Sequence, residues 1–201
     1  MNKLLIATTN LHKLKEIRAI LADLNLEILS LADLKQAVPD VVENGETFKE
    51  NALKKASEIA THTGMLTLAD DSGLSVDILG GIPGVYSARF AGDSKDDAEN
   101  RHKLLDMLAD YSQRDQRTAR FKCAMALCSP SKVVGIVEGE CEGYIIDEEI
   151  GDNGFGYDSI FFYPDFGKTF AQASSEEKNK VSHRLRALEL IKPVLKDFVN
   201  K

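Results

Sequence analysis

The sequence predicts an α/β fold. Apolar runs typical of buried strands alternate along the chain with amphipathic stretches whose apolar residues recur at helical spacing. The chain has 201 residues, which is long enough to bury a substantial core. No internal repeat, low-complexity tract or linker divides it, so we expect a single domain over residues 1–201, with at most two lobes.

The composition is that of an ordinary soluble protein, with 43% hydrophobic and 28% charged residues. The formal net charge of −7 argues against a protein that binds duplex nucleic acid or an anionic membrane. Such a chain can still bind phosphates through a few placed Lys and Arg side chains or through a metal ion. The apolar run Leu4–Ala7 is too short for a signal peptide or a membrane span. Cys123, Cys128 and Cys141 lack metal-ligand spacing, and their odd number predicts reduced thiols in a cytoplasmic protein.

The N-terminal segment is typical of a strand that leads through a polar turn into a helix. Residues 3–8 predict a short buried strand, and the helix after Asn10 places four apolar residues on one stripe, Leu14, Ile17, Leu21 and Leu24. Lys13 lies in the first turn of this helix, where the helix dipole disfavours a cation. An anion bound between Lys13 and the N-terminal amides would explain that position. A phosphate site and a plain strand–helix connection both fit this pattern.

A second strand is predicted at residues 26–29, and a helix begins near residue 46 and is closed by Gly64. Lys55 falls in or beside the buried stripe of this helix, and Asn51 borders the same face. A lysine in that position either extends its ammonium to solvent or points it into a cleft towards an anionic ligand. Glu43 provides a carboxylate just before the helix.

The stretch Met65–Asp77 combines strand-like alternation with two adjacent carboxylates. Leucine and valine side chains alternate on both sides of Asp70-Asp71-Ser72-Gly73, which interrupts them. Aspartate is disfavoured in strands, and a buried carboxylate needs a cation or several hydrogen-bond donors. One interpretation is a metal-binding or general-base site at the end of a strand. The other is an Asp-Ser-Gly turn of a hairpin.

The middle of the chain predicts a glycine-dense loop, a helix and a hairpin. After the loop at residues 79–84, Ser94 is predicted to cap a helix that carries Asp96 and Asp97 in its first turn. Residues 117–127 and 133–146 alternate as two strands of an antiparallel hairpin that turns around residues 129–131. Three glutamates of the second strand share one face, which we expect to face solvent: Glu138, Glu140 and Glu142.

A second glycine-rich loop, Gly151–Asp158, leads into an apolar strand at residues 159–163. Ser174 begins a capping-box pattern for a short helical turn that contains Lys178. Ser182 is predicted to cap the last helix, in which Pro193 either introduces a kink or resets the final turns. His183 and Arg184 lie in its first turn, where cations again oppose the helix dipole.

These segments together resemble the inosine/xanthosine triphosphate pyrophosphatase family, the Ham-type enzymes that hydrolyse non-standard purine nucleoside triphosphates. The matching segments occur in the family's order over nearly the whole chain. They are Thr8-Thr-Asn-Leu-His-Lys13, Glu43 with Gly45 and Thr47-Phe48, Asn51-Ala-x-x-Lys55-Ala56, Ala69-Asp-Asp-Ser-Gly-Leu74, Pro83-Gly-Val-Tyr-Ser-Ala-Arg-Phe90, Gly154-Phe-Gly-Tyr-Asp158 and Lys178 with Ser182-His-Arg184. Thr9 is a departure, because many members have glycine there.

The resemblance implies a long, twisted, mixed central sheet flanked by helices, in two lobes with a nucleotide cleft between them. It implies the reaction NTP + H2O → NMP + pyrophosphate, with dITP, ITP and XTP as substrates and Mg²⁺ as cofactor. It also implies a homodimer. We expect no nucleic-acid or membrane partner.

The resemblance further assigns roles to individual residues. Asp71 and Glu43 would hold Mg²⁺, with Asp71 also taking a proton from the attacking water, while Asp70 supports the site and Ser72 lies nearby. Lys13 and Lys55 would bind phosphates, assisted by the segment Thr8, Thr9, Asn10, Leu11 and His12.

The purine base would be bound by elements from the C-terminal third. His183 and Arg184 would donate to O6, which adenine lacks as an acceptor, so that adenine would leave buried donors unpaired. Phe155 would stack on the ring within the loop that also contains Gly156, Tyr157 and Asp158. We expect Lys178 to face the N1/C2 edge and to disfavour the 2-amino group of guanine.

Two other functions compete with this interpretation. One is a Maf-like pyrophosphatase for other modified nucleotides, against which the ordered base-site segments argue. The other is a nucleotide-sensing module that binds without turnover, which the intact carboxylates of the predicted metal site disfavour.

Overall fold

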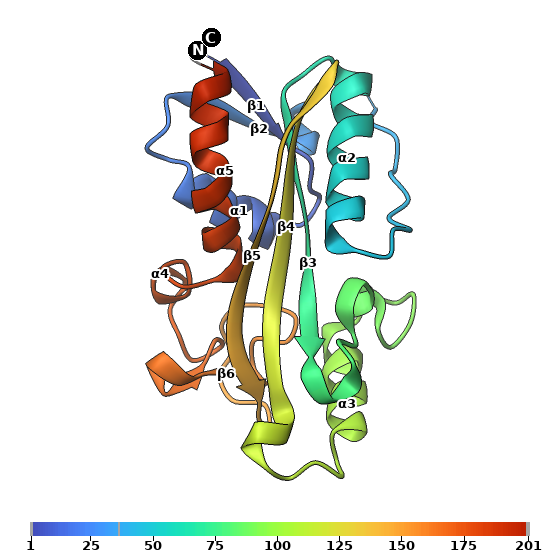
Figure 1. Cartoon of the computed structure of the whole chain (residues 1–201), viewed down its shortest axis with the longest axis vertical. Helices are drawn as coiled ribbons and strands as arrows, with labels where there is room; N and C mark the ends of the chain where they lie inside the picture. Colours follow the sequence, from blue (N-terminus) through green and yellow to red (C-terminus); the bar gives the residue numbers. More distant parts are fainter. Residues whose placement is uncertain (1, 36, 200–201) are drawn as a thin grey trace. The chain divides into compact units, whose positions relative to one another are not determined.

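The computed structural model describes residues 2–35 and 37–199. These residues form a seven-stranded sheet with flanking helices, in the strand order β2-β1-β3-β4-β5-β6-β7 (Figure 1). The strands are β1 (Asn2–Ile6), β2 (Leu26–Ser30), β3 (Thr67–Val76), β4 (Thr118–Ser129), β5 (Lys132–Ile145), β6 (Phe161–Tyr163) and β7 (Lys168–Thr169). The α-helices are α1 (Leu11–Ile20), α2 (Phe48–Thr63), α3 (Asp97–Met107), α4 (Ser175–Lys178) and α5 (His183–Val199). The predicted α/β class is therefore confirmed.

The sheet is mixed. β1 pairs in parallel with β2 and with β3, whereas β6 pairs antiparallel with β5 and β7. The neighbours β4 and β5 are joined by only Pro130 and Ser131, a connection that fits antiparallel strands. The predicted hairpin is thus present, and Glu138, Glu140 and Glu142 on β5 are exposed as expected.

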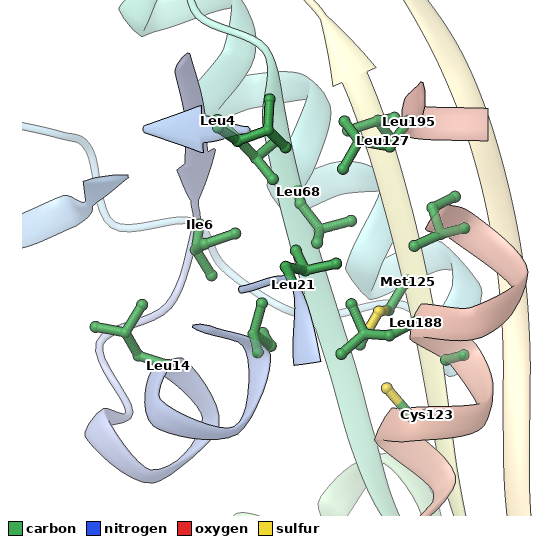
Figure 2. Close-up of a cluster of buried hydrophobic side chains, with 14 residues drawn as sticks. Leu4, Ile6, Leu14, Leu21, Leu68, Cys123, Met125, Leu127, Leu188 and Leu195 are labelled. Carbon is green, nitrogen blue, oxygen red and sulfur yellow. The ribbon is translucent and has the colours of Figure 1, made fainter. Parts of the chain in front are cut away.

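The chain divides into two compact units, each with its own core. Unit 1 comprises residues 1–71, 123–139 and 183–201, and unit 2 comprises residues 72–122 and 140–182. The core of unit 1 is aliphatic and is built from β1, β3, β4, α1 and α5 (Figure 2). The core of unit 2 is richer in aromatic rings, with Phe121, Phe161 and Phe170 in mutual contact. The strands β3, β4 and β5 contribute residues to both units.

The local signals that set the helix boundaries acted largely as predicted. Thr47 caps α2 and completes a capping box with Glu50, and Gly64 ends the helix in a left-handed conformation at φ 71°. Asp96 caps α3 by accepting from the amides of Ala98 and Glu99, so the prediction of Ser94 as the cap was wrong. Ser94 instead donates to Glu99 from outside the helix.

Asp70-Asp71-Ser72-Gly73 does not interrupt the strand, and both the hairpin turn and the strand-end location were wrong. β3 runs unbroken through all four residues. Tertiary contacts decide this conformation. A Cβ on residue 73 would lie 2.6 Å from the Gly84 carbonyl oxygen, so glycine is required there by close packing rather than by a turn.

Two smaller differences concern the ends of the chain. β1 ends at Ile6 rather than at residue 8. Pro193 lies inside α5, which continues to Val199 while Ile191 and Leu195 on either side are buried in the core. In the described residues, 2–35 and 37–199, no helix has both the length and the apolar character that crossing a bilayer requires. The predicted nucleotide cleft between two lobes stays a prediction.

Candidate active site

The first turn of α1 brings Lys13 to an aspartate of β3. Asn10 caps the helix, and its Oδ1 accepts from the amides of His12 at 2.9 Å and Lys13 at 3.1 Å. The Lys13 ammonium lies 2.9 Å from Oδ2 of Asp70. This ion pair offsets the unfavourable position of a cation at a helix N-terminus.

Asp70 is 1% exposed and lies among cations. Besides Lys13, the Arg184 Nε is 3.6 Å from the same carboxylate oxygen. Burial alone would raise the pKa of Asp70, but Lys13, Arg184 and Lys55 outweigh it and hold that pKa well below its usual range. Asp70 is therefore a fixed negative charge that draws three cations together.

Arg184 is buried between two carboxylates. Its guanidinium pairs with Glu16 of α1 and with Asp70 of β3. Burial by itself lowers the pKa of Arg184, but Glu16 and Asp70 more than reverse this effect, so that the pKa is raised. The sequence interpretation overlooked Glu16. Its spacing of three residues from Lys13, on one face of a helix, is a signal that could have identified it.

One face of α2 contacts the same part of β3. The Asn51 side chain donates to Oδ2 of Asp71 at 2.9 Å, and one turn later the Lys55 ammonium donates to the Asp70 carbonyl oxygen at 3.0 Å. Lys55 also forms an ion pair with Glu43. Of the two alternatives for Lys55, the ammonium therefore meets acceptors within the protein and does not extend to solvent, while its binding of a phosphate stays a prediction.

The pKa of Asp71 is shifted in the opposite direction from that of Asp70. Burial raises the pKa of Asp71, and the nearby Glu43 raises it further, against the lowering by Asn51, Lys13 and Lys55. The two adjacent aspartates are thus shifted in opposite directions. Asp71 is the better proton acceptor of the two, whereas Asp70 stays ionised.

Two carboxylates of this cluster have the donor chemistry that a divalent cation accepts. Glu43 and Asp71 are hard carboxylate donors close enough for each to influence the other. Among the described residues no group of three or more His, Cys, Asp and Glu side chains forms a complete metal site. Mg²⁺ is usually held by one or two carboxylates together with waters and substrate phosphates, so Glu43 and Asp71 are the residues that could hold it.

His183 and Arg184 begin α5, which lies directly against β5. A Cβ on Gly139 of β5 would lie 2.4 Å from the Ala187 nitrogen and 2.5 Å from the His183 carbonyl oxygen. Only glycine permits this approach, and it fixes the first turn of α5. Both His183 and Arg184 are consequently buried in unit 1.

A second cluster lies in unit 2, around Asp158. Its Oδ2 accepts from the Lys178 ammonium at 2.6 Å and from the Phe155 amide at 3.0 Å. Lys178 is 5% exposed and lies 4.9 Å from the centroid of the Phe155 ring. A cation over an aromatic face is favourable, and the arrangement couples the loop at residues 151–158 to α4.

The remaining predicted site residues are distributed between the two units. Unit 1 contains Thr8, Thr9, Asn10, Leu11 and His12, of which Thr9, Leu11 and His12 are exposed. Unit 2 contains Ser72, Gly156 and Tyr157.

Tyr157 is buried in the core of unit 2. Its hydroxyl donates to the Ser87 carbonyl oxygen at 2.8 Å, and burial raises its pKa. The ring of Tyr157 therefore anchors the glycine loop, and a substrate contact there would come from its backbone.

Comparison with known proteins places these residues in a family context. The family model described as the Ham1 family matches residues 4–194. A Bacillus licheniformis protein named dITP/XTP pyrophosphatase is 48% identical over 97% of this chain and 98% of its own length. A Listeria monocytogenes protein of the same name is 46% identical over 100% of this chain and 98% of its own length.

Solved structures agree in fold. A HAM1 protein from Coxiella burnetii has a TM-score of 0.88 and 40% identity, covering 98% of this chain and 100% of that one. The Staphylococcus aureus Ham1 protein has a TM-score of 0.86 and 38% identity, covering 98% of this chain and 99% of that one. The resemblance found in the sequence is confirmed, and the chain belongs to the Ham1 family.

Proposed function

We propose that this protein hydrolyses the non-standard purine nucleoside triphosphates dITP, ITP and XTP to the monophosphate and pyrophosphate. The activity would remove these nucleotides from the precursor pools of DNA and RNA. The names of the relatives support this proposal, because nearly full-length proteins at 46–48% identity are called dITP/XTP pyrophosphatases. The observation that carries it within the molecule is the grouping of Lys13, Lys55 and Arg184 around two adjacent aspartates of β3.

Charge balance supports a requirement for Mg²⁺. The unit 1 cluster contains three cations, Lys13, Lys55 and Arg184, and four carboxylates, Glu16, Glu43, Asp70 and Asp71. A triphosphate brings about four further negative charges, so the protein cations alone do not neutralise it. Glu43 and Asp71 would hold the ion, which when bound would neutralise phosphate charge and polarise the phosphorus–oxygen bonds.

The residues of unit 1 then have separate tasks in the reaction. Lys13 and Lys55 bind phosphate oxygens and stabilise the charge that develops on them. Asp71 accepts a proton from the water whose oxygen attacks the α-phosphorus. The bond from the α-phosphorus to the bridging oxygen breaks, and pyrophosphate leaves. Asp70 keeps its charge throughout and holds Lys13 and Arg184 in place.

Residues of the C-terminal third of the chain bind the base. Phe155 stacks on the purine, and the Lys178 ammonium, held by Asp158, faces the N1/C2 edge. His183 and Arg184 donate to O6, which hypoxanthine and xanthine present as an acceptor. Adenine presents an amino group at that position and would leave these donors unpaired.

We also propose a cytoplasmic homodimer. Free thiols at Cys123, Cys128 and Cys141 support a reducing compartment. Exposed apolar side chains at Ile78, Ile82 and Tyr86 support a surface that a second copy covers. Light scattering coupled to gel filtration tests the dimer directly.

The experiment that tests the function compares ITP, XTP, GTP and ATP as substrates with Mg²⁺. Pyrophosphate and orthophosphate are measured separately. We expect pyrophosphate from ITP and XTP, with much slower turnover of GTP and ATP. Orthophosphate as the first product, or equal turnover of ATP, would contradict the proposal, and binding of ITP without any product would indicate a sensing module.

A further inference from the structure

Helix α3 holds both peptide groups of Gly156, the residue that follows Phe155. The Gly156 amide donates to Oδ2 of Asp97 at 2.7 Å, and Nη1 of Arg101 donates to the Gly156 carbonyl oxygen at 2.8 Å. Asp97 and Arg101 are four residues apart, one turn of the same helix. Both bonds involve a charged partner, and such bonds are roughly twice as strong as neutral ones.

Arg101 also connects the two ends of the glycine loop. Its Nε forms an ion pair with Oε2 of Glu149 at 2.8 Å, and the Ser159 hydroxyl donates to the same oxygen at 3.0 Å. Glu149 precedes the loop Gly151–Asp158 and Ser159 follows it. One guanidinium therefore contacts the middle of the loop and the residue at its entrance, and through Glu149 it reaches the exit.

The loop needs an external restraint at this position. Gly156 has a φ of 62°, and glycine rotates about its backbone more freely than any other residue. The neighbouring Phe155 is fixed through its amide to Asp158 and through its ring to Lys178. Rotation of the Phe155–Gly156 peptide group would change the direction in which Phe155 presents its ring. The contacts from α3 prevent that rotation.

We propose that Asp97 and Arg101 are positioning residues that set the Phe155 ring for binding the purine base. This inference rests on the proposed function, because it takes Phe155 as the stacking residue. Asp97 and Arg101 contact the Gly156 backbone and not the phosphate-binding cluster. Their removal should weaken recognition of the base and leave triphosphate binding intact.

If Asp97 only stabilised α3, Asp97→Ala would have the same effect as the loss of another carboxylate from the first turn of the helix. Asp97 lies in the first turn of α3, where a carboxylate stabilises a helix through its dipole. Glu99 lies in the same turn, carries the same charge and contacts Ser94 rather than the loop. The variant Glu99→Ala is therefore the matched control for Asp97→Ala.

The first experiment compares a ligand that has a base with one that has none. Steady-state kinetics with ITP give KM and kcat, and competitive inhibition by inorganic tripolyphosphate reports on the phosphate-binding residues alone. For Asp97→Ala and Arg101→Lys we expect the KM for ITP to rise about tenfold, the scale of one lost charge-assisted hydrogen bond. We expect the inhibition constant of tripolyphosphate to change less than about twofold, since no phosphate contact is removed.

Conservative replacements sharpen the test. Asp97→Asn keeps an oxygen that can accept from Gly156, so its KM should fall between those of the parent and Asp97→Ala. Arg101→Lys keeps the charge but lacks the planar fork of donors that contacts both Gly156 and Glu149. The KM of this variant should therefore stay raised although the charge is retained. The inference is wrong if Asp97→Ala behaves like Glu99→Ala, or if KM and the tripolyphosphate constant rise together.

The second experiment does not depend on the function. The chain contains no tryptophan, so Phe155→Trp introduces a single tryptophan into the loop, and excitation at a wavelength that tyrosine does not absorb reports on it alone. In the ligand-free protein we expect acrylamide to quench this tryptophan more strongly after Asp97→Ala than after Glu99→Ala. Equal quenching would overturn the inference. Failure of the parent protein to hydrolyse ITP would instead refute the proposed function, and the two failures are thus distinguishable.

Discussion

Asp70 and Asp71 are adjacent on β3, yet replacing each with asparagine should have opposite consequences. Asp70 is buried against Lys13 and Arg184, and these cations hold the pKa of Asp70 low. Asp71 is buried beside Asn51 and Glu43, and burial raises the pKa of Asp71. The carboxylate of Asp70 therefore stabilises the fold, whereas that of Asp71 is held at the expense of stability.

The expected size of the stability change follows from these contacts. Asp70→Asn leaves the buried Arg184 and the partly buried Lys13 without their shared carboxylate, and breaking a buried ion pair in this way costs about 3–5 kcal/mol. For a protein of this size that loss lowers the melting temperature by about 6–20 °C. Asp71→Asn removes a charge disfavoured by burial, so its melting temperature should stay within about 4 °C of the parent or rise.

The stabilisation contributed by the Asp70 carboxylate should decrease at low pH. The pKa of this carboxyl is lowered from its ordinary value of 3.8, so the folded state releases the proton more readily than the unfolded chain. Its stabilisation is fully present above that ordinary pKa and is lost as the pH falls through the lowered one. The loss in free energy of unfolding caused by Asp70→Asn, relative to the parent, should be constant from about pH 7 to pH 5 and should shrink below about pH 4.

The two variants should also differ in catalytic activity. Asp71→Asn removes the proton acceptor and should lower kcat by about 10²–10⁴-fold while the protein remains folded. Thermal unfolding followed by circular dichroism gives the stabilities, and pyrophosphate release from ITP gives kcat. Asp77→Asn is the control, since Asp77 pairs with Arg120 but is 42% exposed and should change stability by less than about 1 kcal/mol. A larger loss of stability for Asp71→Asn than for Asp70→Asn would refute this reasoning.

Three further predictions concern other parts of the molecule. Glu16→Gln weakens the neutralisation of Arg184 and should lower the melting temperature by several degrees, about 1–3 kcal/mol, in a thermal-shift assay; an unchanged value would show that this ion pair is dispensable. Lys178→Ala should bring GTP turnover closer to that of XTP, and an unchanged ratio in a pyrophosphate-release assay would exclude Lys178 from discrimination at the 2-amino group. Burial raises the pKa of Cys123 to about 12, so a thiol reagent at pH 8 should label Cys123 only after denaturation.

The sequence predicted those features that depend on local chemistry. Thr47 and Gly64 bound α2 because a capping residue and a left-handed glycine act on their own neighbours. Lys13 and Lys55 were correctly identified as cations in places that local preference disfavours, and such a conflict signals a distant partner. Alternation correctly predicted Ala119, Phe121, Cys123, Met125 and Leu127 of β4 as buried, but it missed that Ala124, Ala126 and Cys128 on the other face are buried too.

Features set by distant contacts were not predictable in the same way. The local preference of Asp-Ser-Gly for turns was overridden by Lys13, Asn51 and Ser87, which lie far from Asp70–Gly73 in the sequence. The ion pair of Arg184 with Glu16 spans 168 residues. The contacts of Asp97 and Arg101 with Gly156 span 59 and 55 residues. No periodicity or motif connects such pairs within one sequence.

Cleavage of the triphosphate at its α-phosphorus is tested most directly by the position of an oxygen isotope in the products. ITP is hydrolysed in H2¹⁸O with Mg²⁺, and the products are separated and examined by mass spectrometry. Water that attacks the α-phosphorus places one ¹⁸O in the inosine monophosphate and none in the pyrophosphate. Label in the pyrophosphate, or the appearance of orthophosphate and inosine diphosphate, would contradict the proposed reaction.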